Sequence, residues 1–216
     1  VYNVAVGYKA GVALTSGTHN VFVGGRAGVG TTDVDKTVII GVEAAEADMT
    51  SAADGTIAIG YAALKALTSG AGNVAIGYEA LIGHTTGSRN TALGYGAMND
   101  TDANDCPTSV DNVMIGYDAG GGTWTTNDSN SNVGVGNYVM DAAMNGAVNN
   151  TAIGHYAASA LTTGDYNTCL GSATGQTLTT GSSNTIIGFA AGDAITDTGS
   201  VVLVGQNAGT NINNTG

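Results

Sequence analysis

Acidic and amide side chains alternate in the segment NDTDANDC, which contains Asp100, Asp102, Asn104 and Asp105. Oxygen ligands at alternate positions are typical of a calcium-binding loop. However, Asp105 stands where a loop of the EF-hand kind needs glycine, and Asp111 replaces its usual bidentate glutamate. Asp100, Asp102 and Asn104 are therefore a calcium candidate, for which we favour the simpler interpretation of a solvated insertion.

Two pairs of acids, Glu43 with Glu46 and Asp33 with Asp35, have residue types that serve in acid–base chemistry. Glycoside cleavage requires two such acids held about 5 to 10 Å apart on one face. Nothing in these spacings indicates that arrangement. The glycines recur at a fixed period, which explains them without a phosphate-binding loop. We expect no enzyme activity, no catalytic residue and no cofactor.

The histidines and cysteines do not form a metal or redox set. His19, His84 and His155 fall before a strand, in a turn and in a tyrosine-rich column, without a second ligand at useful spacing. We expect them in surface or stacking roles. Cys106 and Cys169 occupy unrelated positions, so we expect two unpaired small residues.

Two aromatic residues are candidate contacts for a glycan or receptor. Trp124 lies in the insertion GGGTWTTNDSNSN, and Tyr117 follows a strand-like run. Aromatic rings on protruding loops stack well on sugars. For Trp124 the alternative is packing against the body of the protein.

These residues lie in a chain that repeats one short pattern twelve times. The pattern is Asn, a β-branched residue, a small or apolar residue, an aliphatic residue and a marker glycine, often followed by Tyr. Successive marker glycines are 17 to 22 residues apart, and the variation falls between the strands. A fixed period of this kind is typical of a solenoid. The marker glycines are Gly7, Gly24, Gly41, Gly60, Gly77, Gly94, Gly116, Gly136, Gly154, Gly171, Gly188 and Gly205.

The three residues before each marker glycine are apolar on both sides of the predicted strand. Ile76 represents a column that is aliphatic in every copy, and we expect this column to form the core. Val74 represents a β-branched column that points to the same side. The residue between them, such as Ala75, is also mostly apolar. The second face therefore needs cover from the rest of the coil or from another chain.

Asn begins the strand in nine copies. If equivalent residues stack at the strand spacing of about 4.8 Å, their amides can bond to one another and to the turn backbone. We expect a structural ladder that includes Asn73, Asn90, Asn112, Asn150, Asn167 and Asn184.

The remainder of each repeat predicts turns. Pieces such as YAALKAL indicate a short helical turn after the strand, whose exact form is left open. Triplets such as Thr68-Ser69-Gly70 and Thr162-Thr163-Gly164 then close the coil, with Gly available for a positive φ.

Composition narrows the class further. The chain of 216 residues has only five Lys and Arg and a formal net charge of −12, which argues against a nucleic-acid partner. No apolar run is long enough to insert into a membrane. We predict one all-β domain over 1–216, a parallel β-solenoid or β-roll of about twelve 17-residue repeats. Because the pattern runs from end to end, we expect an internal piece of a longer fibre.

The repeats NTALGYGAM, NVAIGYEALIGHTTGSRNTALGY and NTAIGHYAASALTTGDYNTCLG resemble those of phage tail-fibre and other virion fibre proteins. They are more distantly similar to the head repeats of trimeric autotransporter adhesins, whose period is shorter. The resemblance implies a homotrimer displayed on a virion or a cell surface. The doubly apolar strand independently predicts self-association.

The leading functional hypothesis is therefore a structural and adhesive fibre segment that supports or mediates attachment to a host surface. Ice binding by regular threonine ranks is one alternative, although the insertions after Gly94, Gly116 and Gly136 interrupt such ranks. A self-assembling matrix or surface filament is another.

Overall fold

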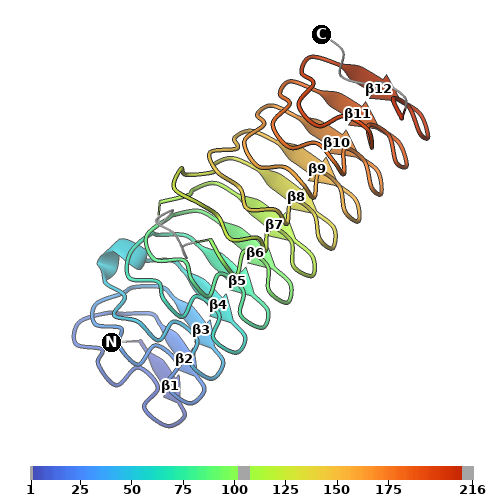
Figure 1. Cartoon of the computed structure of the whole chain (residues 1–216). Coiled ribbons are helices and arrows are strands. Elements are labelled where there is room, and N and C mark those ends of the chain that lie inside the picture. The colour runs from blue at the N-terminus through green and yellow to red at the C-terminus, as the bar shows by residue number, and fades with distance from the viewer. Residues whose placement is uncertain (1, 102–107, 211–216) are drawn as a thin grey trace.

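The chain forms one parallel β-solenoid in a computed structural model that describes residues 2–101 and 108–210 (Figure 1). It makes about eleven turns of about 17 residues, and each strand pairs in parallel with the next to give one twelve-stranded sheet. The predicted all-β solenoid is confirmed. The strands are β1 (Val4–Val6), β2 (Val21–Val23), β3 (Val38–Ile40), β4 (Ile57–Ile59), β5 (Val74–Ile76), β6 (Thr91–Leu93), β7 (Val113–Ile115), β8 (Val133–Val135), β9 (Thr151–Ile153), β10 (Thr168–Leu170), β11 (Thr185–Ile187) and β12 (Val202–Val204).

Equivalent residues of successive coils lie side by side along the whole sheet. In β5 and β6, for example, Ile76 pairs with Leu93. The register continues across the longest interval, where Leu93 pairs with Ile115 of β7. Extra residues therefore lie in the connections and leave the sheet unbroken, as the stacked arrows in Figure 1 show.

The interior of the coil is lined by the middle residue of each strand. Ala75 and Ala92 are fully buried, whereas the flanking residues Val74 and Ile76 are only partly buried and Leu93 is exposed. The expectation that the aliphatic column before the marker glycine forms the core is therefore wrong. That column and the β-branched column together form the outer face of the sheet.

The asparagines explain which face turns inward. Side chains alternate along a strand, so the residue that begins the repeat points to the same side as the middle strand residue. Asn73 and Asn90 are fully buried, because their amides bond the backbone at the coil corner, where Asn73 Nδ2 donates to Gly70 O and to Gly87 O, both at 2.8 Å. Once Asn points inward, the aliphatic column and the β-branched column have to point outward.

From Asn73 to Asn184, the buried asparagines form a continuous hydrogen-bonded ladder. Asn150 donates its backbone N–H to Asn132 Oδ1 at 3.0 Å, and its side-chain Nδ2 donates to Gly164 O at 2.8 Å. Its own Oδ1 accepts the backbone N–H of Asn167 at 2.9 Å. The same pattern connects the six residues expected in the ladder, which are Asn73, Asn90, Asn112, Asn150, Asn167 and Asn184.

The marker glycines hold successive coils at close range. Their φ angles lie between +126° and +144°, a region that residues with a side chain rarely adopt. A Cβ added at Gly77 would lie 2.1 Å from the carbonyl oxygen of Gly94 in the next coil. Both observations explain why Gly recurs at this position in every copy.

The segment after each strand is a run of alternating backbone conformations rather than a helix. Ala62 and Leu64, within YAALKAL, both have φ of +52°. Ala62 N–H donates to Val42 O of the preceding coil and Leu64 N–H to Ala80 O of the following coil, both at 3.0 Å. Bonds to two neighbouring coils replace the bonds of a helical turn. The one helix in the described part of the chain is the 3₁₀ helix η1 (Ser51–Ala53).

The turn glycines also serve a different purpose from the one expected. Gly70 has a positive φ of +104°, but Gly164 does not. A Cβ at Gly164 would lie 2.2 Å from Gly181 O of the next coil. At this corner glycine is required by the approach of neighbouring backbones.

Three glycine-to-alanine variants should separate these effects. Gly25 has open space and no positive φ, so Gly25→Ala should leave stability unchanged or slightly raised. Gly55 has open space but a φ of +72°, so Gly55→Ala should cost about 1 kcal/mol. Gly77→Ala combines positive φ with a backbone clash and should cost more than about 3 kcal/mol. Urea unfolding gives the order, and equal effects at Gly55 and Gly77 would contradict the close-approach explanation.

Removing one member of the ladder should strongly destabilise the coil. Asn150→Ala leaves the N–H of Asn167 and the carbonyl of Gly164 without their partner, at a cost of about 3 kcal/mol. Asn150→Thr should cost less, because Thr37 occupies the same column and its hydroxyl donates to Asn20 Oδ1 at 2.8 Å.

The neighbouring exposed residue provides the control for this substitution. Asn149 has φ of +58°, which glycine adopts freely, so Asn149→Gly should change stability by less than about 0.5 kcal/mol. Urea unfolding of the three variants tests the ladder, and a similar loss at positions 149 and 150 would count against it.

Candidate functional site

The calcium candidate is only partly covered by the structure. Asp100 accepts a hydrogen bond from the Thr123 hydroxyl, and its backbone carbonyl accepts the N–H of Trp124 at 3.1 Å. Asp102 and Asn104 lie outside the described residues. Within the described ranges no group of three or more His, Cys, Asp or Glu side chains could hold a metal ion.

The acidic pairs are engaged in contacts within the chain. Glu43 and Glu46 both face Lys65, whose Nζ lies 2.7 Å from Glu43 Oε2 and 3.2 Å from Glu46 Oε2. Arg26 pairs with the same two acids from the preceding coil. The hydrogen bond from Lys65 lowers the pKa of Glu43. This network connects three successive coils of the solenoid.

The second acidic pair bonds to the backbone. Asp33 Oδ1 accepts the N–H of Ser51 at 2.8 Å. Asp35 Oδ1 accepts the backbone N–H of Thr18 at 2.6 Å and its hydroxyl at 3.0 Å, and these hydrogen bonds lower the pKa of Asp35. Both acids therefore cap turns of neighbouring coils.

Two histidines occupy stacking positions at the surface. The ring of His19 lies 5.1 Å from that of Tyr2, and the ring of His155 lies 4.2 Å from that of Tyr156 in an edge-on contact. His84 differs, because it is fully buried in the core. The expectation of a surface or stacking role is therefore wrong for His84.

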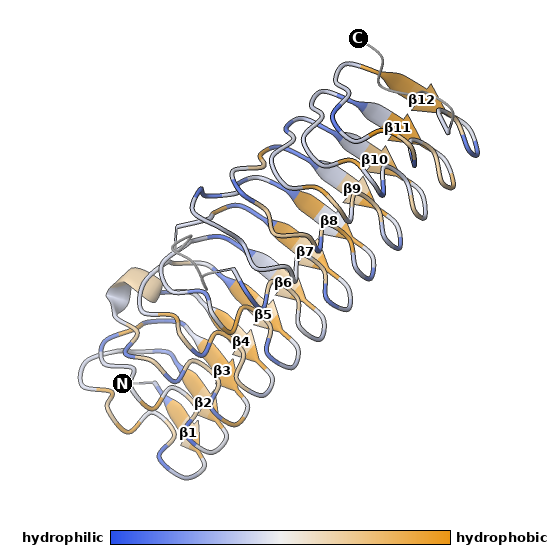
Figure 2. Ribbon diagram, viewed as in Figure 1, coloured by the Kyte–Doolittle hydropathy of each residue, from blue (hydrophilic) through white to orange (hydrophobic). Residues whose placement is uncertain are grey.

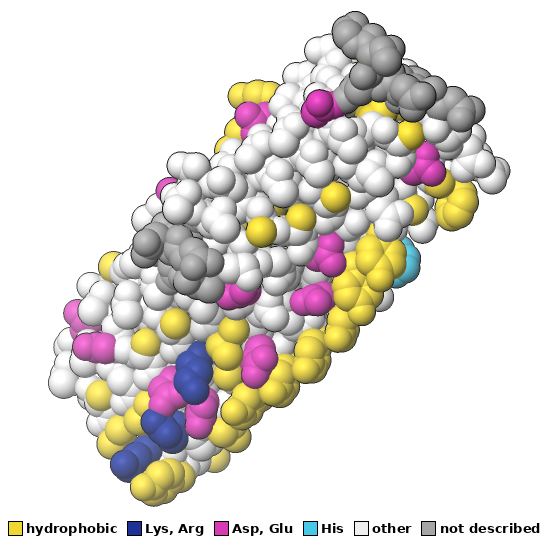
Figure 3. Space-filling view, in the orientation of Figure 1, with side chains coloured by type: hydrophobic (Ala, Val, Ile, Leu, Met, Phe, Trp, Pro, Cys, Tyr) yellow, Lys and Arg dark blue, Asp and Glu magenta, His cyan; other side chains and the backbone are white. Residues whose placement is uncertain are grey.

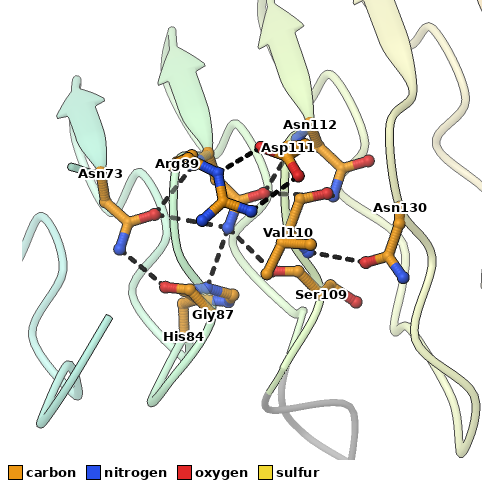
Figure 4. A network of polar contacts seen from close by, with 10 residues as sticks. Asn73, His84, Gly87, Arg89, Ser109, Val110, Asp111, Asn112 and Asn130 are labelled. Atoms are coloured by element: carbon orange, nitrogen blue, oxygen red, sulfur yellow. Dashed lines mark hydrogen bonds and ion pairs between the residues drawn. The ribbon is translucent and has the colours of Figure 1, made fainter. Parts of the chain in front are cut away.

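The hydrogen bonds of His84 define its neutral form, and Figure 4 shows His84 together with residues of the ladder. Nε2 lies 3.1 Å from Asn90 Nδ2, which is a donor, so Nε2 must be the acceptor. Nδ1 then carries the proton and donates to Thr101 Oγ1 at 3.2 Å. Asn90 Nδ2 also donates to Ser109 O at 2.8 Å. A proton on Nε2 would point at the Asn90 amide and disturb the ladder.

The most extensive feature of the surface is the apolar outer face of the sheet. Figure 2 shows apolar residues in the strands along its length. Two parallel rows of side chains flank the buried middle column, and Leu93, Ile153 and Leu170 are 44%, 40% and 45% exposed. We call these two rows the aliphatic face. Its partly buried and exposed members come from every strand from β1 to β12.

A row of tyrosines lies just beyond the marker glycines, at one margin of the aliphatic face. Hydrophobic side chains form a continuous row along one long edge in Figure 3. The rings of Tyr61, Tyr78, Tyr95 and Tyr117 stack with centroids 5.2, 4.7 and 5.3 Å apart and interplanar angles of 17°, 8° and 11°. We call these four residues the tyrosine stack. Strand register produces it, because each ring follows its strand at the same position.

The two candidate contact residues have different surroundings. Trp124 is fully buried, and its Nε1 donates to Gly120 O at 3.1 Å, so it presents no ring at the surface. The alternative of packing against the coil therefore describes Trp124. Tyr117 is 43% exposed at the end of the tyrosine stack, where the ring of Tyr138 packs edge-on against it with the centroids 5.3 Å apart.

Threonines of the turns use their hydroxyls within the protein. Thr15, Thr68 and Thr162 donate to the carbonyl of the equivalent residue in the next coil at 2.9 to 3.1 Å. These three hydroxyls donate their hydrogen to the neighbouring coil and so help to close the coil corner.

The fold and surface define this chain as a parallel β-solenoid with one exposed apolar face. No pocket occurs in the described ranges. None of their helices has the length and hydropathy that crossing a bilayer would require. Comparisons with protein-family models, curated proteins and solved structures find no match to the chain.

His84 should make the protein sensitive to acid. Burial lowers the pKa of His84 from 6.5 to about 4. The fold accommodates the neutral ring of His84. The contribution of this residue to the free energy of unfolding is therefore complete above pH 6.5 and is lost as the pH falls from 6.5 to 4. We expect this group to account for roughly 3 kcal/mol of the acid destabilisation.

Urea unfolding over this pH range checks the prediction. His84→Leu should lose less stability on acidification, because Leu67 and Leu161 fill the equivalent position in other coils. His155→Leu removes an exposed histidine and is the matched control, with the pH dependence of the parent protein. Parallel pH profiles for His84→Leu and the parent would show that His84 is not responsible.

Proposed function

We propose that this chain is a structural and adhesive fibre segment, part of a virion tail fibre or a cell-surface adhesin, that supports or mediates attachment to a host surface. The observation that carries the proposal is the aliphatic face, an outward-facing strip that runs along the whole sheet and is interrupted by hydroxyls only at Thr91, Thr151, Thr168 and Thr185. The resemblance of the repeats to those of virion fibres points to the same function and to a location outside the cell or on a virion.

The aliphatic face supports self-association. With twelve strands about 4.8 Å apart and two rows about 7 Å apart, it covers roughly 400 Å² per chain. An exposed apolar patch of this size is often functional. Since the identical face is present on every copy, another copy of the chain is the partner with matching length and spacing.

A homotrimer of parallel chains is the arrangement that we propose. Three flat faces can meet around one axis and enclose a triangular apolar core, with equivalent residues at equal height. The tyrosine stack, which lies beyond the marker glycines, would then occupy the rim of that core. This arrangement resembles the trimeric organisation of the fibres to which the repeats are similar.

Contact with a cell-surface glycan or receptor would involve residues left on the outside. Trp124 is unsuitable because it is buried, whereas Tyr117 is partly exposed. The acidic pairs are held in ion pairs and turn caps, which supports a structural rather than an enzymatic role. We propose no cofactor.

The mass of the protein in solution tests the proposal. Light scattering during size-exclusion chromatography should give the mass of three chains. Leu93→Asp combined with Ile153→Asp should give single chains, because two charges per copy would be buried in the apolar core. Far-ultraviolet circular dichroism should remain that of the parent, since both positions are exposed in one chain.

The matched control adds the same charge elsewhere. Thr163→Asp with Thr180→Asp changes two exposed turn residues and should leave the mass at three chains. A parent protein that is a single chain or a dimer would overturn the trimer. Long polymers in electron micrographs would favour the filament, and thermal hysteresis at micromolar protein would favour ice binding.

A further inference from the structure

We propose that the tyrosine stack is a site of oxidative cross-linking, where one-electron oxidation joins tyrosines of neighbouring coils into dityrosine. The inference concerns a modification of the fibre and is independent of its oligomeric state. It depends on four phenol rings that the strand register holds face to face.

The geometry places neighbouring rings in position for coupling. Tyr78 and Tyr95 have the closest centroids, 4.7 Å apart, and their planes differ by only 8°. Tyr61 and Tyr117 extend the stack at both ends with centroid distances of 5.2 and 5.3 Å. In nearly parallel rings at this separation, the carbon atoms ortho to the hydroxyl of one ring lie beside those of the next.

The tyrosine stack is also accessible to an oxidant from solvent. Its four rings are 40% to 52% exposed. By contrast, the methionine, tryptophan and cysteine side chains of the described residues are buried, and these are Met49, Met98, Met114, Met140, Met144, Trp124 and Cys169. Oxidation is therefore directed to tyrosine, and an electron vacancy can move between stacked rings about 5 Å apart.

The neighbouring carboxylate supplies a proton acceptor. Glu79 follows Tyr78 in the chain, and its hydrogen bond with the phenol raises the pKa of Tyr78. A tyrosine that loses an electron must also lose its hydroxyl proton. Glu79 can accept that proton and pass it to solvent.

The step balances with a peroxidase-class enzyme and hydrogen peroxide as the oxidant. Two phenols each give up one electron and one proton and become phenoxyl radicals. A carbon–carbon bond forms between their ortho carbons, and the hydrogen on each of these carbons moves to the oxygen, which restores both phenols. Hydrogen peroxide takes up the two electrons and two protons and becomes two molecules of water.

The consequence for the fibre is a covalent bond between successive coils. Coils of a solenoid are otherwise held by hydrogen bonds and apolar contacts, so they can separate one at a time from an end. A bond between Tyr78 and Tyr95 would join two coils within one chain. Coils on both sides of that bond would then separate less readily.

Photo-oxidation of the full chain with tris(bipyridine)ruthenium and persulfate, at low protein concentration, tests the proposal. We expect dityrosine fluorescence, a mass lower by two hydrogen atoms per bond, and linked peptides that join Tyr78 to Tyr61 or Tyr95. Denaturing gels should show mainly single chains, which identifies the bonds as intramolecular.

Phenylalanine variants provide the decisive comparison. Tyr78→Phe with Tyr117→Phe leaves no two adjacent tyrosines in the stack and should reduce the stack-derived linked peptides at least tenfold. Tyr8→Phe with Tyr166→Phe removes two exposed phenols outside the stack and should leave these peptides at the parent level. Circular dichroism confirms that each variant is folded.

Three results would overturn the proposal. The first is an equal yield of stack-derived linked peptides in the parent and in Tyr78→Phe with Tyr117→Phe. The second is linked peptides that come mainly from tyrosines without a stacked partner, that is, from outside both the tyrosine stack and the separate pair of Tyr138 and Tyr156, whose centroids lie 5.0 Å apart. Loss of the linked peptides in the outer-tyrosine control would also contradict it, because the four stacked rings are intact there.

Discussion

The structure depends on one constraint, the close approach of backbones in successive coils. Neighbouring chain segments meet at glycines that have no room for a Cβ, and buried asparagines bond the coils together along the interior. Everything else follows from this spacing. Because each coil repeats the previous one at the strand distance, any residue type that recurs in the sequence becomes a row in space.

The rows have different physical consequences inside and outside the coil. Inside, the Asn row satisfies buried polar groups and sets which side of the strand faces inward. Outside, aliphatic rows remain partly open to water, and a tyrosine row stacks at their margin. The alternation of side-chain direction along each short strand therefore has two effects. It places the stabilising asparagines inside one chain, and it places the aliphatic face, which supports the proposed assembly, outside.

Much of this was predictable from the repeat, and the failures have physical causes. The period, the strands and the stacking of asparagines follow directly from the fixed positions of Asn and Gly. Hydrophobicity could not decide which strand face is inside, because Ala75 and Ile76 are both apolar. The position of Asn73, two residues before Ala75, would have identified the inner face. An amide that bonds the turn backbone must point inward, and residues two apart in a strand point to the same side. Ala62 and Leu64 have high helix propensity, which conceals their positive φ.

The environments of the candidate residues were also predictable only where the repeat pattern covers them. Trp124 lies in an insertion, and its burial depends on contacts that no local pattern reveals. His84 falls in a turn, but the equivalent position in the preceding coil holds the buried Leu67, and that comparison would have indicated a core histidine. The tyrosine stack was visible as a column of the repeat, although its ring geometry required the register of the sheet.

The irregular coils have a further consequence for how the chain reaches one structure. Identical repeats can pair one coil out of step at little cost in energy, which would produce shifted and exchanged forms. Thr37 stands in place of a ladder asparagine and bonds to Asn20, and the buried His84 faces Thr101, so both match the neighbours that they have in the native order. These departures from the repeat penalise a shifted alignment, so the least regular residues help to select a single fold.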